Sequence, residues 1–316
     1  MWESFGVAFN AVMPFMIYLF IGYGLVRIGW ADRAFLNRLN KLTFQAIFPF
    51  MMFQNIYGVS SDGMPSAKLL VFSVVSLLTL IGLLMLIVPR IVKENPRRGV
   101  IIQGIFRSNF VLYGISLTTF VYGEERASVA GILIMVVVSL FNVSAVVVLE
   151  AFREGEKSSL GQLLMKLVKN PLLQGCVLGL IAFFLHIKLP TFLEKPVSAL
   201  AGMATPLAMI TLGGTLQFSS LKKNRKPICA VLVLKLVLIP IVMLCAAYAL
   251  GLREVELFLV LVIYATPVAT SSYPMAANMG GDGELAGQLV FVSSLVSLGT
   301  MFFFIFCLSR LGLLGL

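Results

Sequence analysis

The 316-residue sequence is 59% hydrophobic and only 12% charged, with a mean hydropathy of +0.99. Soluble domains carry about 25% charged residues, so this composition excludes a water-soluble globular domain and indicates a helical bundle embedded in lipid. The formal net charge of +10 would suit nucleic-acid binding in a soluble protein, but here the basic residues stand between apolar runs. That pattern favours cytoplasmic loops of a membrane protein and argues against nucleic acid as a partner.

Apolar runs separated by charged breaks predict an all-α integral membrane fold with ten transmembrane helices. Each crossing needs about 20 apolar residues, so ten crossings with short loops use up the chain and leave no stretch for a soluble domain. The first run has no basic region before it and is interpreted as a span rather than as a cleaved signal peptide. In chain order, the predicted spans are residues 5–27, 36–57, 67–89, 99–121, 127–149, 171–187, 197–217, 227–250, 256–278 and 286–309.

A short segment between the fifth and sixth spans, residues 158–170, has leucines on one helical face and lysines beside them. This pattern predicts an amphipathic helix that lies in the membrane interface. The expected domain organisation is therefore a first five-helix repeat at 1–153, a cytoplasmic linker with the amphipathic helix at 154–170, and a second five-helix repeat at 171–316.

Basic residues collect in the loops on the side of the membrane opposite the N-terminus. Examples are Arg33 and Arg38 after the first span, Arg97 and Arg98 after the third, and the run 222–226 after the seventh. Because cytoplasmic loops carry an excess of Lys and Arg, this side is predicted to be cytoplasmic. We expect a multi-pass protein of the cell inner (plasma) membrane, surrounded by the lipid bilayer, with both termini extracytoplasmic.

The two halves of the sequence match each other at an offset of 157 residues, where Pro14 falls on Pro171 and Pro49 falls on Pro206. Matches between apolar residues are common by chance in such a chain, but two proline pairs at one offset are less common, given 13 prolines in 316 residues. Because each half has an odd number of spans, the two repeats are predicted to be inverted relative to each other. Inverted repeats are typical of secondary transporters, in which similar halves exchange conformations to expose one site alternately.

The fourth and ninth predicted spans are interrupted at equivalent positions, which predicts a midplane substrate site between two crossed, broken helices 4 and 9. Asn109 and Gly114 lie near the middle of one span, and Pro267 and Pro274 interrupt the other. Helix N-termini at this centre would suit an anion. The alternative is two ordinary kinked helices whose hydroxyls bond to their own backbone. The substrate-binding candidates in these segments are Ser108, Asn109, Gly114, Thr266, Pro267, Ser271 and Ser272.

The two interrupted segments, together with Gly280-Gly281-Asp282, resemble the bacterial auxin efflux carrier family, which is related to the plant PIN-formed auxin carriers and more distantly to the bile acid/sodium symporters. The resemblance covers essentially the whole chain. It implies a scaffold subdomain, a mobile transport subdomain with the crossed helices, a homodimer, and efflux or exchange of organic carboxylates such as malate, malonate or auxin-like acids. The plant carriers have Asn-Pro-Asn where this chain has Ser108-Asn109-Phe110, which argues against auxin itself as the substrate.

Two cations, Arg107 and Lys235, fall inside predicted spans, whereas no Asp or Glu falls in the central third of any span. This asymmetry favours an anionic substrate and argues against a cation/proton antiporter. Arg107 could grip a substrate carboxylate, or it could extend to the cytoplasmic surface. Lys235 could be a coupling residue that stands where the related folds bind sodium, or a charge that faces an aqueous cavity.

Amide side chains in other spans are further candidates for the substrate path. Gln54 and Asn55 follow Pro49 in the second span and could equally hydrogen-bond between helices. Asn142 in the fifth span has the same ambiguity. The sequence thus adds Gln54, Asn55 and Arg107 to the substrate-binding candidates and Lys235 as a coupling candidate.

These observations predict a secondary active transporter that exports or exchanges an organic carboxylate by elevator-type alternating access. A passive organic-anion channel, a sodium-coupled organic-anion symporter and a ligand-binding sensor remain alternatives. The protein is not expected to be an enzyme, because the one histidine, His186, lies at a span end and there is no G-x-S-x-G motif. The four cysteines lie singly without metal-ligand spacing, so no metal or other cofactor is expected.

Overall fold

The computed structural model describes residues 2–59, 64–127, 129–153 and 160–315. In this part of the chain the structure is helical and has no β-strand. The first half contains α1 (Trp2–Arg27), α2 (Arg33–Leu42), the π-helix η1 (Thr43–Ile47), α3 (Phe48–Tyr57), α4 (Ala67–Ile91), α5 (Asn95–Phe106), α6 (Phe110–Ala127) and α7 (Val129–Ala151).

The second half begins with α8 (Leu160–Lys169), which corresponds to the predicted amphipathic helix; residues 154–159 of the predicted linker lie outside the described residues. The axis of α8 and the axis of the helix that follows it are bent by 69° relative to each other. The remaining elements are α9 (Pro171–Phe184), α10 (Thr191–Thr215), the 3₁₀ turn η2 (Phe218–Leu221), α11 (Arg225–Val233), the π-helix η3 (Leu234–Leu238), α12 (Ile239–Ala249), α13 (Glu254–Ala265), α14 (Ser272–Asn278) and α15 (Gly283–Arg310).

Capping residues explain several of these boundaries. The side chain of Asp32 accepts a hydrogen bond from the backbone of Phe35 at the start of α2, and Asp282 does the same for Leu285 at the start of α15. Prolines follow both π-helices by two residues, at Pro49 and Pro240 in the sequence. A proline ring crowds the carbonyl one turn earlier and removes one hydrogen bond, and the wider turn before it relieves this crowding while the span continues.

Five helices in the described residues are long and apolar enough to cross a membrane, or six if the bent pair α8–α9 is one span. This confirms a multi-pass helical membrane protein, but not the count of ten. Several predicted spans fall short of the length test because their helices are interrupted, as in 99–121 and 256–278. The five long helices are Ala67–Ile91, Val129–Ala151, Thr191–Thr215, Arg225–Ala249 and Gly283–Arg310.

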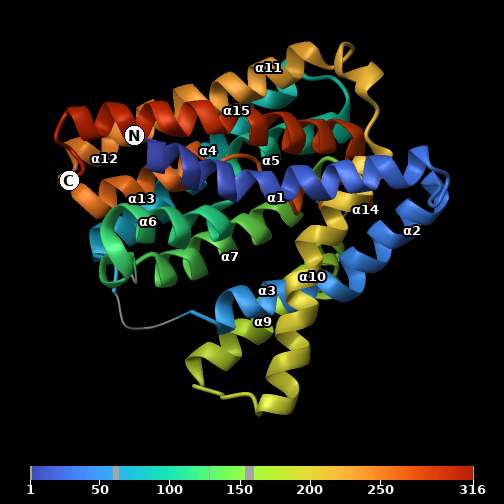
Figure 1. Ribbon diagram of the computed structural model, residues 1–316, viewed down its shortest axis with the longest axis horizontal. Coiled ribbons are helices and arrows are strands. Elements are labelled where there is room, and N and C mark those ends of the chain that lie inside the picture. Colours follow the sequence, from blue (N-terminus) through green and yellow to red (C-terminus); the bar gives the residue numbers. More distant parts are fainter. Residues whose placement is uncertain (1, 60–63, 128, 154–159, 316) are drawn as a thin grey trace.

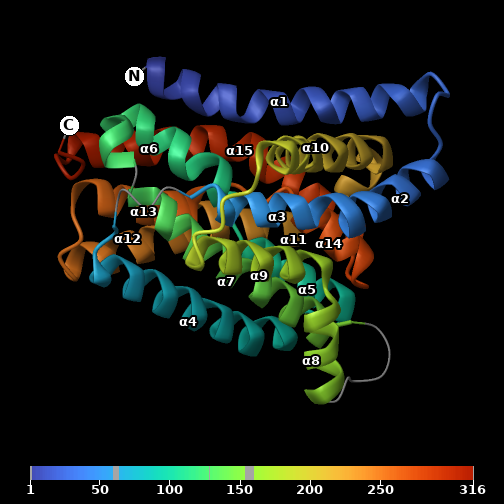
Figure 2. The same cartoon turned by 90° about the horizontal axis from the view of Figure 1, so that it is seen from below.

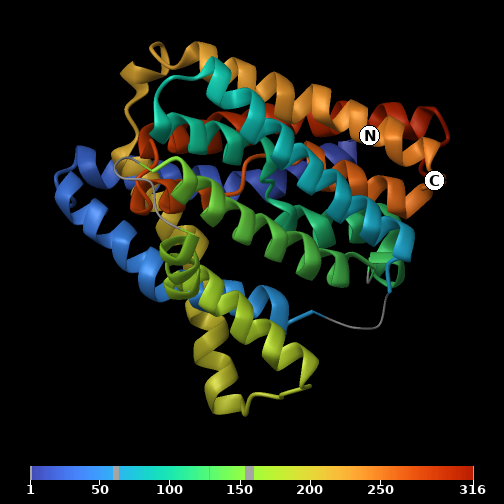
Figure 3. The same ribbon diagram turned by 180° about the vertical axis from the view of Figure 1, so that it is seen from behind.

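The helices form two groups (Figure 1). We call α1, α2, α3, α9 and α10 the peripheral group. Extensive contacts of α1 with α10 and of α3 with α9 hold this group together. Helices α4 to α7 and α11 to α15 form the second group, which we call the bundle. The view from behind shows α9 and α10 extending away from the bundle (Figure 3), and the view from below shows α1 and α4 along opposite edges of the molecule (Figure 2).

Glycines bring the two longest helices of the peripheral group into backbone contact. A Cβ atom added to Gly22 in α1 would lie 1.9 Å from the carbonyl oxygen of Ile210 in α10, and one added to Gly213 would lie 1.9 Å from that of Leu19. No real side chain fits these distances, so the crossing of α1 and α10 requires glycine on both helices.

We expect Gly22→Ala to destabilise the protein by about 1–3 kcal/mol, because the added methyl group must push α10 away from α1. The measurement is thermal unfolding in detergent. Gly24→Ala is the matched control, since the described residues leave the space around Gly24 open within 4 Å. Equal melting temperatures for the two variants would contradict the required close approach.

Candidate functional site

Two helix interruptions meet in the middle of the bundle, as the sequence predicts. Helix α5 ends at Phe106 and α6 begins at Phe110, whereas α13 ends at Ala265 and α14 begins at Ser272. The first residue of each connection, Arg107 or Thr266, is extended, and the two connections pair through an antiparallel bridge between Ser108 and Val268. Because lipid offers no hydrogen bonds, each interruption supplies partners for the backbone of the other.

Further hydrogen bonds complete this crossing. The backbone N–H of Asn109 donates to the carbonyl of Pro267 at 2.9 Å, and that of Val268 donates to the Ser293 hydroxyl at 3.1 Å. The Thr266 hydroxyl donates to the Val262 carbonyl at 2.8 Å, which serves one carbonyl at the end of α13. These bonds fix the direction in which the neighbouring side chains leave the crossing.

Ion pairs join the two broken helices again at their outer ends. Arg97 at the start of α5 pairs with Asp282 just beyond α14, and Arg126 at the end of α6 pairs with Glu254 at the start of α13, each at 3.3 Å. The broken helices are therefore linked at the centre and at both ends.

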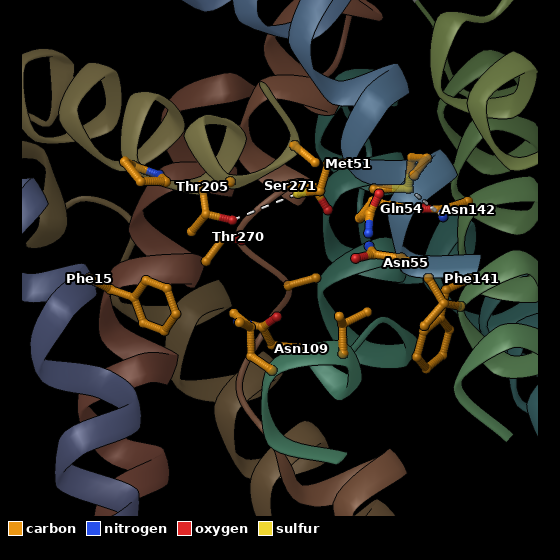
Figure 4. Close-up of a pocket in the computed structure, with 18 of the residues that line it drawn as sticks. Phe15, Met51, Gln54, Asn55, Asn109, Phe141, Asn142, Thr205, Thr270 and Ser271 are labelled. Atoms are coloured by element: carbon orange, nitrogen blue, oxygen red, sulfur yellow. Dashed lines mark hydrogen bonds between the residues drawn. The ribbon is translucent and has the colours of Figure 1, made fainter. Parts of the chain in front are cut away.

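A cavity of about 570 Å³ lies beside the crossing, between the peripheral group and the bundle (Figure 4). Its walls come from α1, α3 and α10 on one side and from α6, α7 and both interruptions on the other. Figure 4 shows Asn55 and Asn109 entering it from opposite walls. Its polar lining residues are Tyr18, Gln54, Asn55, Arg107, Ser108, Asn109, Ser116, Asn142, Ser198, Thr205, Thr270 and Ser271.

The structure brings most of the substrate-binding candidates to this cavity: Gln54, Asn55, Arg107, Ser108, Asn109 and Ser271 line it.

The other four candidates lie outside its lining. Gly114 faces α7, where an added Cβ would be 3.0 Å from Ile134. Thr266 and Pro267 are used in the backbone pairing described above. Ser272 is buried in the first turn of α14. None of these four residues lines the cavity, and only Thr266 and Pro267 stand in the interruptions themselves.

The substrate-binding candidates from the sequence include no residue of the wall that α10 contributes. Ser198, Gly202 and Thr205 recur at helical spacing and line the cavity on one face of that helix. A stripe of small and polar residues in an apolar span was the available signal.

Arg107 is the single charged residue among the described residues that line the cavity. Its side chain is buried rather than extended to the membrane surface, which contradicts the alternative in which it reaches the cytoplasmic side. One guanidinium nitrogen donates to the Asn142 carbonyl at 2.5 Å, and the other contacts the sulfur of Met275. Neither partner carries a charge, so the cation has no counter-ion in the described part of the chain.

Lys235 lies in η3, away from the cavity. It is completely buried, and η3 contacts α5, α13 and α15, so the alternative in which Lys235 faces an aqueous cavity is not what the structure shows. Its ammonium group has no hydrogen-bond partner among the described residues. Among the helices that contact η3, α5 and α13 are half-helices that end at the crossing.

A second cavity, of about 330 Å³, lies further along α10. The first cavity touches residues 198–206 of this helix and the second touches residues 212–217. At the second cavity, the hydroxyl of Thr215 in α10 shares a hydrogen bond of 2.8 Å with the hydroxyl of Tyr273 in α14. This hydrogen bond joins the peripheral group to the bundle at the wall of the second cavity, because both residues line that cavity.

Comparison with known proteins agrees with this architecture. The chain matches the family described as "membrane transport protein" over residues 7–305. An uncharacterized transporter of Methanothermobacter thermautotrophicus is 24% identical over 299 residues, covering 92% of this chain and 94% of the relative. A candidate malonate transporter of Rhizobium meliloti is 24% identical over 296 residues, covering 92% of each chain.

In the absence of any anion, we expect Arg107→Met to raise the melting temperature, because it removes a buried charge that lacks a counter-ion. The control is Arg97→Met, which should lower the melting temperature because Arg97 has Asp282 and Glu94 as ion-pair partners. Differential scanning fluorimetry in chloride-free, carboxylate-free detergent buffer measures both. A large fall for Arg107→Met would mean that its charge is already compensated.

Proposed function

We propose, from the premise that the chain belongs to the membrane transport protein family, that it carries an organic carboxylate across the membrane by alternating access. This is the auxin efflux carrier family that its motifs resemble, and membership makes the protein a transporter rather than an enzyme. The observation that carries the proposal is the cavity beside the crossed helices, in which Arg107 is a buried cation with only neutral partners.

A small carboxylate supplies what this cavity lacks. Guanidinium groups bind carboxylates through charge-assisted, paired hydrogen bonds. Asn109, Thr270 and Ser271 offer further hydrogen bonds at the same wall, and α6 begins there with its positive N-terminal end. The volume is in the range of small-molecule sites. The candidate malonate transporter among the relatives supports malonate or malate as the first substrates to test.

Matching helix contacts support the inverted five-helix repeats and the ten-span topology. Gly22 of α1 meets the backbone of Ile210 in α10, and Gly179 of α9 meets the backbone of Phe53 in α3. Both Gly179 and Ile210 lie 157 residues after their counterparts Gly22 and Phe53, the same offset as the proline pairs. The start of α1 and the end of α15 also lie at the same end of the molecule, as an even number of crossings requires (Figure 1).

In this proposal the bundle slides against the peripheral group, as in an elevator-type transporter, and takes the crossing and its bound anion with it. The first cavity is then the access route from the outside and the second cavity marks the route to the cytoplasm. Movement toward the inward-open state breaks the hydrogen bond between Thr215 and Tyr273, which joins the two groups. A passive channel would need both cavities to be connected at once.

In the same proposal, Lys235 is a fixed cation that takes the place of a coupling sodium ion. Helices α5 and α13 both end at the crossing, and their last carbonyl groups carry partial negative charge. The buried ammonium in η3, which packs against both helices, compensates that charge. A sodium-coupled symporter would instead leave this position to a free ion.

We expect Asn109→Ala to lower carboxylate transport at least about tenfold, because a hydrogen-bonding group at the proposed site is lost. The measurement is counterflow of labelled malonate and malate into proteoliposomes preloaded with the same anion. Stimulation by the internal anion requires alternating access and separates a carrier from a channel. Asn95→Ala, at the far end of the same broken span, is the control. Unchanged transport by Asn109→Ala would show that the site is wrongly placed.

For Lys235→Ala we expect transport at least about tenfold slower, with a new dependence on sodium or on pH, because the carbonyl ends of α5 and α13 lose their cation. Initial rates are compared across sodium concentration and pH. Lys226→Ala, an exposed lysine at the start of the same span, is the control. If the rate and both dependences match the unmodified protein, Lys235 has no part in coupling.

A further inference from the structure

Asn142 in α7 is completely buried and has its amide oriented by its neighbours. The carbonyl oxygen accepts from Arg107 at 2.5 Å. The amide nitrogen donates to the sulfur of Met52 at 2.9 Å, dashed in Figure 4, and lies 3.5 Å from the sulfur of Cys176. A guanidinium can only donate and a thioether can only accept, so no flipped amide satisfies the same contacts.

The amide therefore holds Arg107 without neutralising it. Aspartate has nearly the same shape as asparagine, and at this position it would form an ion pair with the guanidinium inside the protein. A neutral acceptor fixes the same geometry and leaves the full positive charge beside the cavity. Since the cavity offers no carboxylate among its described lining residues, the counter-ion must come from outside the chain.

We infer that Asn142 is a positioning residue of the anion site: it orients Arg107 toward the substrate and keeps the charge of Arg107 available for the substrate carboxylate. This inference rests on the proposed carboxylate transport. It assigns to Asn142 a role in binding that contact between helices alone does not require.

The partners of Asn142 also divide between the two helix groups. Arg107 and Asn142 both belong to the bundle, whereas Met52 in α3 and Cys176 in α9 belong to the peripheral group. Sulfur atoms are weak hydrogen-bond acceptors. When the bundle slides, Asn142 gives up only these weak bonds and keeps its strong bond to Arg107. The arginine therefore stays oriented throughout the transport cycle.

The test is Asn142→Asp, measured by thermal unfolding with and without malonate and by malonate counterflow. We expect the melting temperature without anion to rise, the stabilisation by malonate to disappear, and transport to be lost. A residue with a purely structural role would not raise stability while abolishing the ligand response. Asn170→Asp is the matched control, because Asn170 is also buried and also near a methionine sulfur but has no hydrogen bond to an arginine in the described part of the chain. It should keep the malonate response.

A second variant keeps the test decisive if the aspartate disturbs packing. In the Arg107→Met background, Asn142→Asp buries an unpaired carboxylate and should lower the melting temperature, so the effect of the substitution changes sign. Two results would overturn the inference. One is that malonate stabilises Asn142→Asp as much as it stabilises the unmodified protein. The other is that Asn142→Asp changes the melting temperature in the same direction in both backgrounds. A third result separates the two proposals. If no carboxylate stabilises the unmodified protein, but Asn142→Asp still raises the melting temperature when Arg107 is present and lowers it in the Arg107→Met background, the proposed function fails. The conclusion that Arg107 is held without a counter-ion then remains.

Discussion

The need to satisfy backbone hydrogen bonds inside a membrane governs this structure. Two helices are interrupted in the bundle, and each interruption exposes peptide groups that lipid cannot serve. The bridge between Ser108 and Val268, with the bond from Asn109 to Pro267, lets the two interruptions satisfy each other. This pairing requires the broken helices to cross, and the crossing places four helix ends, a polar wall and a buried arginine at one point. The cavity, the proposed anion site and the sliding of the bundle all depend on it.

The few polar side chains in the interior have distinct electrostatic roles. Arg107 is surrounded by an amide and a sulfur, which hold it without cancelling its charge. Lys235 has no hydrogen-bond partner among the described residues and stands in η3, which contacts the half-helices α5 and α13. Both cations are costly in the folded chain by themselves. In the proposed transport cycle an anion enters and leaves the cavity, and the bound anion offsets this cost in the state that carries it.

Sequence reasoning could locate the interruptions because Asn109, Pro267 and the equivalent spacing of the two halves are local signals. It could not tell cavity walls from structural parts of the crossing, since that depends on which way each residue of an extended segment turns. The Thr266 hydroxyl bonds back to α13 and the Pro267 carbonyl accepts from the partner segment, whereas Ser108 and Ser271 line the cavity. The neighbours of Arg107 were equally inaccessible, because Met275 lies 168 positions away in the chain. The wall from α10 was readable in principle from Ser198 and Thr205, which share a helical face.

The ion pairs at the two ends of the broken helices differ in their surroundings. The side chains of Arg97 and Asp282 are 23% and 25% exposed, whereas those of Arg126 and Glu254 are 55% and 53% exposed. Solvent and dissolved salt weaken the more exposed pair first. The crossed helices should therefore loosen from the end that holds Arg126 and remain anchored at the end that holds Arg97. In the proposed ten-span topology these ends face opposite sides of the membrane. The ionic strength of one compartment alone would then loosen one end of the crossed helices while the other end stays in place.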